Sequence, residues 1–183
     1  MLDNVRLLVE QDTLGPPLSD EKYILATLHR AELTSHPQKL LSILKTLDSS
    51  QTQVFLPLHP RTKTVLQENR AYEHFSNSLN LISPLGYREI LGAVQGASRV
   101  VTDSGGLQKE AYFLGKPCIT VRPETEWKET VSVGWNRLVG LDSKALEHAL
   151  DCFDPTQKNR PNLYGKGDAA DKISAILLES LSS

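Results

Sequence analysis

The chain has 183 residues, of which 39% are hydrophobic, and a formal net charge of −2 from 20 basic and 22 acidic side chains. This length allows one sizeable core, so we expect a single domain over residues 1–183. The charges are mixed without a basic block, which argues against nucleic-acid binding, and no run of 18 apolar residues predicts a membrane span. Cys118 and Cys152 lack zinc-type spacing, so we expect no metal site and two buried thiols in a reducing cytoplasm.

Apolar runs of strand length alternate along the chain with stretches of helical periodicity. The predicted strands are Tyr23–Leu28, Gln53–Leu58, Leu79–Ser83, Arg99–Thr102, Cys118–Val121 and Arg137–Val139. The predicted helices are Pro37–Leu47, Thr62–Glu68, Tyr87–Gln95, Leu107–Leu114, Thr125–Val133, Lys144–Asp151 and Asp168–Leu181. The last of these is amphipathic, with Asp168 as a candidate N-cap, and it could pack on this domain or cross to another one.

The strands are apolar along their whole length, as is typical of parallel strands that are covered on both faces. Together with the strand–helix repetition, this predicts an α/β fold with a Rossmann-like, doubly wound parallel sheet of about six strands. Ligands of such folds bind at the carboxyl ends of the strands. The residues that follow the strands should therefore share one rim, and they include His29-Arg30, His59-Pro60-Arg61, Pro84-Leu85-Gly86, Ser104-Gly105-Gly106 and Arg122.

Histidines and arginines follow directly on several of these apolar strands, where a structural loop more often carries Gly, Asn or Ser. One arginine in such a place is most simply a solvated loop residue. The set as a whole favours an anionic ligand such as a diphosphate.

The turn Ser104-Gly105-Gly106 lies between an apolar strand and a helix. Glycines let a ligand approach the backbone, and a helix start offers unpaired N–H groups with a favourable dipole, so the turn is suited to a phosphate. The carboxylate of Glu110 could accept hydrogen bonds from a ribose diol. The same three residues also fit an ordinary strand-to-helix connection in which Ser104 is the N-cap.

Taken together, several segments resemble the C-terminal half of the non-hydrolysing UDP-N-acetylglucosamine 2-epimerases. They are LATLHRAE at 25–32, LHPRT at 58–62, PLGY at 84–87, TDSGGLQKEAYFLGKP at 102–117 and RPETEWKETVSVGWNRLVG at 122–140. They occur in the family's order over about two thirds of the chain. The resemblance implies the second Rossmann-like domain of a GT-B fold, with residues 1–20 as a linker or helix that enters from the preceding domain.

The resemblance also implies roles for individual residues. Ser104, Gly105 and Gly106 match the turn against the diphosphate, and Glu110 matches the residue that binds the ribose hydroxyls. Leu85 and Ile90 match positions that line the uracil pocket, and His29 matches a catalytic histidine close to the diphosphate.

Two more sets of matched positions lie on the rim. Arg30 and His59 match positions that, in some bacterial members, contact a second substrate molecule bound as an activator, and Arg30 is also a candidate substrate contact. Arg122, with Arg61 and Glu126, belongs to the matched motifs on the rim, and we expect Arg122 to bind substrate.

The implied reaction needs no nicotinamide cofactor. A base removes the C2 proton while UDP leaves from C1, and re-addition of UDP with protonation of the other face gives UDP-N-acetylmannosamine. The family's catalytic carboxylates lie in its N-terminal domain, so we expect this chain alone to bind UDP weakly and not to epimerise. We also expect a longer parent in which Met1 is an internal position, which pairs this domain with an N-terminal Rossmann-like domain and forms a homodimer.

Two residues depart from the resembled pattern. Lys109 stands where an acidic residue is frequent, and Trp127 stands where many members have arginine, which removes a candidate phosphate or uridine contact. Trp127 could mark a subgroup that acts on a related UDP-sugar. Three other functions stay open: the donor domain of a GT-B glycosyltransferase, a non-catalytic UDP-sugar-binding module, and a hydrolysing epimerase.

Overall fold

The computed structural model describes residues 1–155 and 159–181, and its centre is a six-stranded parallel sheet. The strands follow one another in space as β3-β2-β1-β4-β5-β6. Their bounds are β1 Tyr23–Thr27, β2 Gln53–Pro57, β3 Asn80–Ile82, β4 Arg99–Thr102, β5 Cys118–Thr120 and β6 Asn136–Leu138. This order is that of the doubly wound dinucleotide-binding fold, which confirms the predicted fold class.

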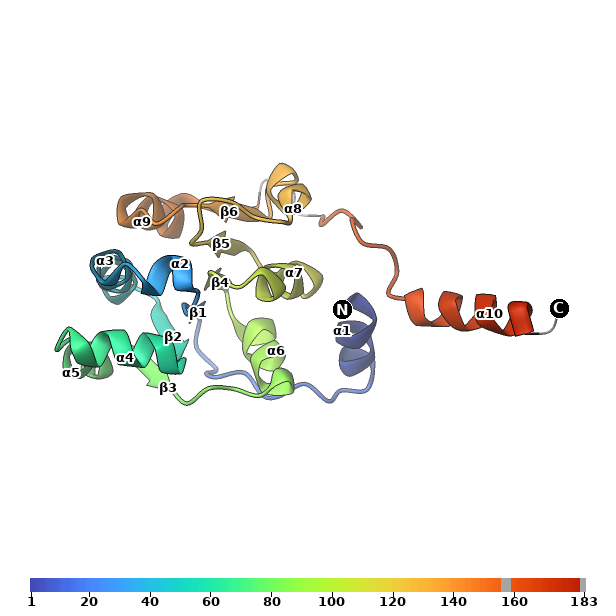
Figure 1. Cartoon of the computed structure of the whole chain (residues 1–183), viewed down its shortest axis with the longest axis horizontal. Helices are drawn as coiled ribbons and strands as arrows, with labels where there is room; N and C mark the ends of the chain where they lie inside the picture. Colours follow the sequence, from blue (N-terminus) through green and yellow to red (C-terminus); the bar gives the residue numbers. More distant parts are fainter. Residues whose placement is uncertain (156–158, 182–183) are drawn as a thin grey trace.

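Helices cover both faces of the sheet. Their bounds are α1 Leu2–Glu10, α2 Ala31–Thr34, α3 Pro37–Asp48, α4 Pro60–Glu68, α5 Tyr72–Ser78, α6 Tyr87–Gly96, α7 Gly105–Phe113, α8 Lys128–Ser132, α9 Ser143–Cys152 and α10 Ala169–Leu181. Figure 1 shows α1, α6 and α7 on one side of the sheet and α2, α3, α4, α5 and α9 on the other.

Strand β1 explains why the predicted strands are apolar throughout. Tyr23 and Leu25 belong to the core cluster that contains residues of α6 and α7, whereas Ile24 and Ala26 belong to the cluster that contains residues of α3 and α9. All four are buried, because successive side chains of a strand point to opposite faces and each face has its own helical layer.

All six predicted strands are present, and the helices differ from the predictions in a few places. Short α2 and α5 were not predicted. Helix α7 begins at Gly105 rather than at Leu107, so the two glycines form its first turn. Helix α8 begins at Lys128 rather than at Thr125, because the Thr125 hydroxyl bonds Gln108 and accepts the N–H of Trp127, which forms a local turn instead of helix.

The start of α10 meets α1, which packs on α7. The carboxylate of Asp3 in α1 accepts the N–H of Ala170 at 2.8 Å, so Asp3 caps α10. Asp168 lies at the predicted start of this helix, but its carboxylate pairs with Lys172 at 3.0 Å. Helix α10 then leads away from the body (Figure 1), and none of its residues is buried. Part of the predicted loop before α10, residues 156–158, lies outside the described residues.

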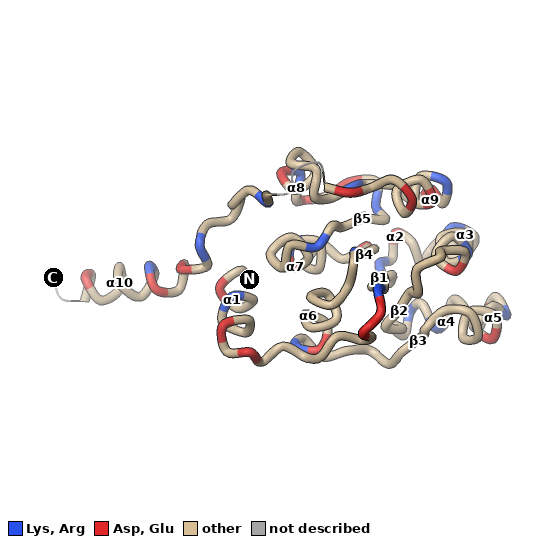
Figure 2. The backbone as a smooth tube through the Cα atoms, turned by 180° about the vertical axis from the view of Figure 1, so that it is seen from behind, with Lys and Arg blue, Asp and Glu red and all other residues tan. Residues whose placement is uncertain are grey.

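Charge is spread over both helical layers, and Figure 2 shows acidic and basic residues interspersed along the tube. Within the described ranges no helix is long and apolar enough to cross a membrane, and no cluster of three or more His, Cys, Asp or Glu could hold a metal ion. Cys118 is buried in β5, but Cys152 is exposed. The expectation of two buried thiols is therefore wrong for Cys152, the last residue of α9, where the chain leaves the helical layer.

Candidate functional site

A cavity of about 300 Å³ lies at the carboxyl ends of the central strands. Strands β1 and β4 are neighbours in the sheet, but the helices that follow them, α3 and α7, cover opposite faces. Such a switch point leaves a crevice outside the strand ends, where ligands of open α/β sheets bind. The lining residues come from the ends of β1, β2 and β4, from the loop between β3 and α6, and from α6 and α7: Thr27, His29, Pro57, His59, Pro84, Leu85, Tyr87, Ile90, Ser104, Gly106, Leu107 and Glu110.

One wall of the cavity is the N-terminus of α7. Ser104 is the N-cap, and its hydroxyl accepts the N–H of Leu107 at 3.5 Å. Gly105 and Gly106 follow as the first two helical residues, whose N–H groups have no acceptor within a helix. A Cβ added to Gly105 would lie 3.3 Å from a carboxylate oxygen of Glu126, so the backbone is closely packed on that side. The turn is thus both a capped helix start and a potential anion site.

A buried carboxylate fixes the position of the loop after β1. Asp103 is fully buried, and its Oδ2 accepts the backbone N–H groups of His29 at 2.7 Å and Arg30 at 2.8 Å. Its Oδ1 accepts no hydrogen bond from the described residues and lies 3.5 Å from Nδ1 of His29. Asp103 thereby joins the ends of β1 and β4 and orients the imidazole of His29.

The protonation of this pair is controlled mainly by burial. Burial lowers the pKa of His29, and the Asp103 carboxylate opposes this shift. The neighbouring His59, Arg30 and Arg61 lower the pKa of His29 further. Burial also raises the pKa of Asp103, although the backbone N–H groups and His29 oppose this. Both shifts favour the neutral forms, so His29 is suited to act as a neutral imidazole near pH 7.

His59 lies directly beside His29. The two rings stack with centroids 5.0 Å apart and an interplanar angle of 24°. Nδ1 of His59 accepts the N–H of Arg61 at 3.1 Å, so His59 caps α4 as well as lining the cavity. The stacked pair forms one continuous polar surface at the ends of β1 and β2.

On the opposite side of the cavity, Glu110 and Tyr87 form a second polar pair. Glu110 is 7% exposed, and its carboxylate interacts with the hydroxyl of Tyr87. Burial raises the pKa of Glu110, while Tyr87 and the chain's amino terminus lower it. Burial and the neighbouring Glu110 raise the pKa of Tyr87 to about 12. A buried carboxylate with one donor already in place can accept further hydrogen bonds from ligand hydroxyls.

Three of the predicted site residues do not line this cavity: Arg30, Gly105 and Arg122. Arg122 is 8% exposed, and its guanidinium bonds Glu32 at 3.2 Å and both carboxylate oxygens of Glu126 at 3.0 Å. These ion pairs use the Nε and Nη1 donors of a side chain that the sequence analysis assigned to substrate. The side chain of Arg30 is exposed on the same part of the rim.

The other predicted residues do come together in the cavity, namely His29, His59, Leu85, Ile90, Ser104, Gly106 and Glu110. Sequence reasoning missed two contributors. Asp103 immediately precedes Ser104, and an acidic residue at the end of an apolar strand could have indicated it. Tyr87 follows the Pro84-Leu85-Gly86 turn, but nothing in the sequence placed its hydroxyl on Glu110.

Comparison with known proteins shows what the chain as a whole is similar to. The model of a family described as UDP-N-acetylglucosamine 2-epimerase matches residues 1–178. The chain is 42% identical over 162 residues to a UDP-N-acetylglucosamine 2-epimerase homolog of Methanococcus maripaludis, covering 87% of this chain and 45% of that protein. It is equally 42% identical over 163 residues to the UDP-2,3-diacetamido-2,3-dideoxy-D-glucuronate 2-epimerase of Pseudomonas aeruginosa, with the same coverage of 87% and 45%.

Among solved structures, the Methanocaldococcus jannaschii UDP-GlcNAc 2-epimerase in complex with UDP-GlcNAc and UDP is similar to this chain, with a TM-score of 0.77 and 34% identity. The match covers 96% of this chain and 48% of that one. The chain therefore spans about half the length of the proteins that it matches.

Proposed function

Because this chain belongs to the UDP-N-acetylglucosamine 2-epimerase family, we propose that it is the UDP-binding half of an enzyme that interconverts UDP-GlcNAc and UDP-ManNAc. The observation that carries the proposal is the cavity at the switch point. There a helix N-terminus, a buried carboxylate and a histidine held by Asp103 lie within one space of about 300 Å³.

Each part of UDP has a chemically suitable partner in this cavity. The diphosphate lies against the turn Ser104-Gly105-Gly106, of which Ser104 and Gly106 line the cavity and Gly105 contributes only backbone, and the helix dipole and unpaired N–H groups there stabilise negative charge. The ribose hydroxyls donate to Glu110, which Tyr87 holds in place. The uracil lies against Leu85 and Ile90, with Leu85 contributing backbone groups.

The reaction that we propose is an elimination followed by an addition. A base takes the C2 proton, the C1–O bond breaks, and UDP leaves with the bonding electron pair, which gives a glycal. UDP then adds back at C1 while an acid delivers a proton to the other face of C2. The helix terminus stabilises the leaving diphosphate, and His29 transfers or holds a proton near it.

The rest of the machinery is proposed to lie outside this chain. The acid–base carboxylates belong to an N-terminal Rossmann-like domain of a longer parent, which closes over the sugar. We expect the isolated chain to bind UDP without epimerising. A homodimeric parent, a cytoplasmic location and an activator contact at Arg30 and His59 remain predictions.

Calorimetric titration of the 183-residue chain with UDP tests the binding site. Glu110→Ala should weaken UDP binding about tenfold or more, because a charge-assisted hydrogen bond contributes about 1.5–3 kcal/mol. Glu147→Ala, a change of the same kind on α9, is the matched control and should leave the affinity unchanged. Equal UDP affinity of folded Glu110→Ala and the unchanged chain would remove Glu110 from the site.

Activity assays test the division of labour. The 183-residue chain alone should form no C2 epimer, whereas the longer parent should incorporate deuterium from solvent at C2. Conversion of UDP-GlcNAc by the isolated chain would refute the proposed role of the absent half. Transfer of the sugar to an acceptor by the parent without C2 exchange would instead indicate a glycosyltransferase.

A second candidate substrate is UDP-2,3-diacetamido-2,3-dideoxy-D-glucuronate, because the Pseudomonas relative that is named for it is as similar as the first. The two sugars differ at C3 and C6, whereas the cavity described here is matched to UDP. Offering both sugars to the parent and following C2 exchange decides between them.

A further inference from the structure

Lys109 of α7 lies between two aromatic rings that come from different parts of the chain. Its Nζ is 4.1 Å from the ring centroid of Trp127 and 4.3 Å from that of Tyr164. Distances below about 6 Å over a ring face are favourable for a cation–π interaction. Lys109 and Trp127 are also the two residues that depart from the resembled pattern, and the structure shows that they are partners.

The indole of Trp127 contacts the proposed diphosphate turn with its other end. Its Nε1–H donates to the carbonyl oxygen of Gly105 at 2.7 Å, a short and therefore well-formed hydrogen bond. Gly105 is the first residue of α7 and follows the N-cap Ser104. The ring of Trp127 thus connects Lys109, one turn further along α7, with the backbone at the start of the helix.

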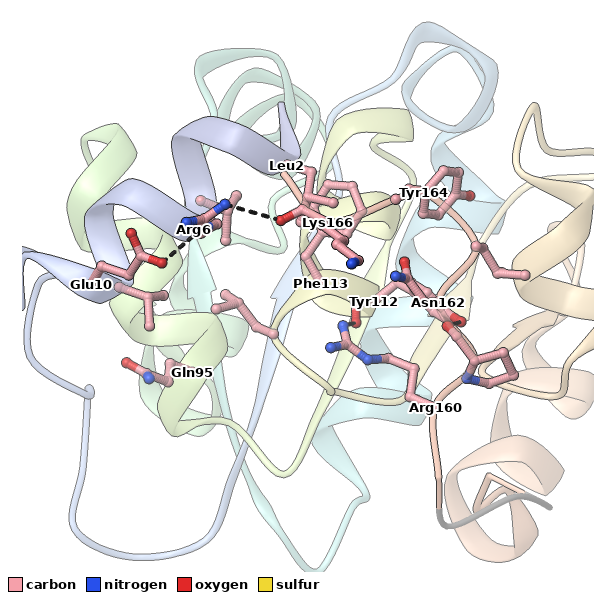
Figure 3. Close-up of a pocket in the computed structure, with 16 residues that line it drawn as sticks. Leu2, Arg6, Glu10, Gln95, Tyr112, Phe113, Arg160, Asn162, Tyr164 and Lys166 are labelled. Atoms are coloured by element: carbon pink, nitrogen blue, oxygen red, sulfur yellow. Dashed lines mark hydrogen bonds and ion pairs between the residues drawn. The ribbon is translucent and has the colours of Figure 1, made fainter. Parts of the chain in front are cut away.

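Tyr164 covers this arrangement from the segment of residues 159–167. Figure 3 shows Tyr164 beside Tyr112 and Phe113 of α7, and its ring centroid lies 5.4 Å from that of Phe113 and 6.3 Å from that of Trp127. The same segment is held to α1, since Arg6 donates to the carbonyl oxygens of Lys166 and Gly167 at 3.3 and 3.2 Å.

We propose that Trp127 and Lys109 are a positioning pair for the diphosphate turn. Lys109, held against Tyr164, fixes the plane of the indole, and the indole N–H fixes the Gly105 peptide so that the N–H groups of the turn face the ligand. The pair does not touch the ligand. This inference rests on the proposed binding of UDP and adds the residues that preorganise that site.

The chain contains only two tryptophans, which provides a matched pair of substitutions. Trp127→Phe keeps a ring for Lys109 and removes the N–H that holds Gly105. Trp135→Phe is the control, because Trp135 is buried and its Nε1 has no hydrogen-bond partner among the described residues. Trp127→Phe should weaken UDP binding about three- to tenfold, as expected for the loss of one hydrogen bond, whereas Trp135→Phe should not.

A second pair of variants tests the cation. Lys109→Met removes the charge and keeps the length of the side chain, and Lys109→Arg keeps a cation that stacks on aromatic rings. We expect Lys109→Met to weaken UDP binding by a similar factor and Lys109→Arg to restore it. In the Trp135→Phe background Trp127 is the single tryptophan, so its fluorescence emission should change with Lys109→Met.

The outcomes separate this inference from the proposed function. Absence of UDP binding by the unchanged chain contradicts the proposed function itself. UDP binding that Trp127→Phe leaves unchanged contradicts the positioning role alone. The unfolding midpoint of ligand-free Trp127→Phe is measured as well. If partial unfolding of this variant accounts for its whole loss of UDP affinity, Trp127 only stabilises the fold, and the inference is overturned.

Discussion

At the scale of single residues, the central feature is the contact between His29 and Asp103. A carboxylate that is fully buried would be costly if unpaired, and here two backbone N–H groups donate to its Oδ2, while the imidazole lies 3.5 Å from Oδ1. The folded chain holds the His29 proton less tightly than the unfolded chain does, because its pKa is lowered. His29 therefore contributes stability above the unfolded pKa of about 6.5, and this contribution is lost as the pH falls from there towards the folded pKa.

Asp103→Asn tests whether the carboxylate sets the proton affinity of His29. The Asp103 charge raises the pKa of His29 against the effect of burial, so its removal should lower that pKa further. The pKa is read from the pH titration of the imidazole NMR signals. Asp142→Asn is the control, since Asp142 also accepts backbone N–H groups but at the start of α9. A pKa of His29 that stays the same or rises in Asp103→Asn would contradict the effect assigned to the carboxylate.

At the scale of elements, two glycines bring the segment between α1 and β1 into direct backbone contact with α6. Gly15 donates its N–H to the carbonyl oxygen of Arg88 at 2.9 Å, and its own carbonyl oxygen lies against Gly92 of α6. A Cβ added to Gly92 would lie 1.9 Å from this oxygen, so the backbones touch directly. This contact holds α6, which carries Tyr87 and Ile90 of the cavity.

Gly92→Ala should therefore destabilise the fold. The added methyl group must displace backbone, and overpacking of this kind costs about 1–3 kcal/mol of unfolding free energy. Gly106→Ala is the control for stability, because its nearest neighbour would be 3.8 Å away and alanine favours the helix. Urea unfolding measures both variants. Equal midpoints for the two would mean that the segment moves away from α6 without cost.

At the scale of the whole molecule, α10 is the element that the rest of the described chain does not bury. Its apolar side chains are exposed: Ile173, Ile176, Leu177, Leu178 and Leu181 at 58, 64, 56, 66 and 83%. A contiguous exposed apolar surface of this kind, on a helix that no other described helix or strand covers, is unusual for a monomer. The predicted alternatives were packing on this domain or crossing to another, and in this chain the helix does not pack on the sheet layers (Figure 1).

Removal of residues 168–183 should leave the unfolding free energy nearly unchanged, within about 0.5–1 kcal/mol, because none of the residues described in α10 is buried. It should also reduce self-association of the isolated chain, since the apolar face is removed. Urea unfolding and sedimentation velocity measure the two effects. The full chain with Ile176→Asp and Leu177→Asp is the matched comparison and should likewise self-associate less. A large loss of stability on truncation would show that α10 supports the core.

Much of this molecule follows from local patterns in the sequence. The apolar runs predict all six strands, although only the central strands β1, β4 and β5 are buried almost throughout and the edge strands β3 and β6 are partly exposed. The residues at strand ends predict a shared rim, because parallel strands end on one side. Helices α2 and α5 were missed because they are short and carry little periodicity. The assignment of His29, Leu85, Ile90, Ser104 and Glu110 to UDP stays a prediction, although the fold brings these residues into one cavity.

The contacts that make the cavity specific required the tertiary structure. His29 and Asp103 are 74 positions apart, and only the pairing of β1 with β4 joins them. Other contacts likewise depend on how side chains from separate elements point towards one another. They are the ion pairs of Arg122 with Glu32 and Glu126, the contact of the Tyr87 hydroxyl with Glu110, and the hydrogen bond from Trp127 to Gly105. Sequence alone determined which residues end the strands, because burial leaves a local pattern. Only the order of the strands in the sheet decided which of these strand-end residues contact one another, because the strand order depends on packing between segments that are far apart in the chain.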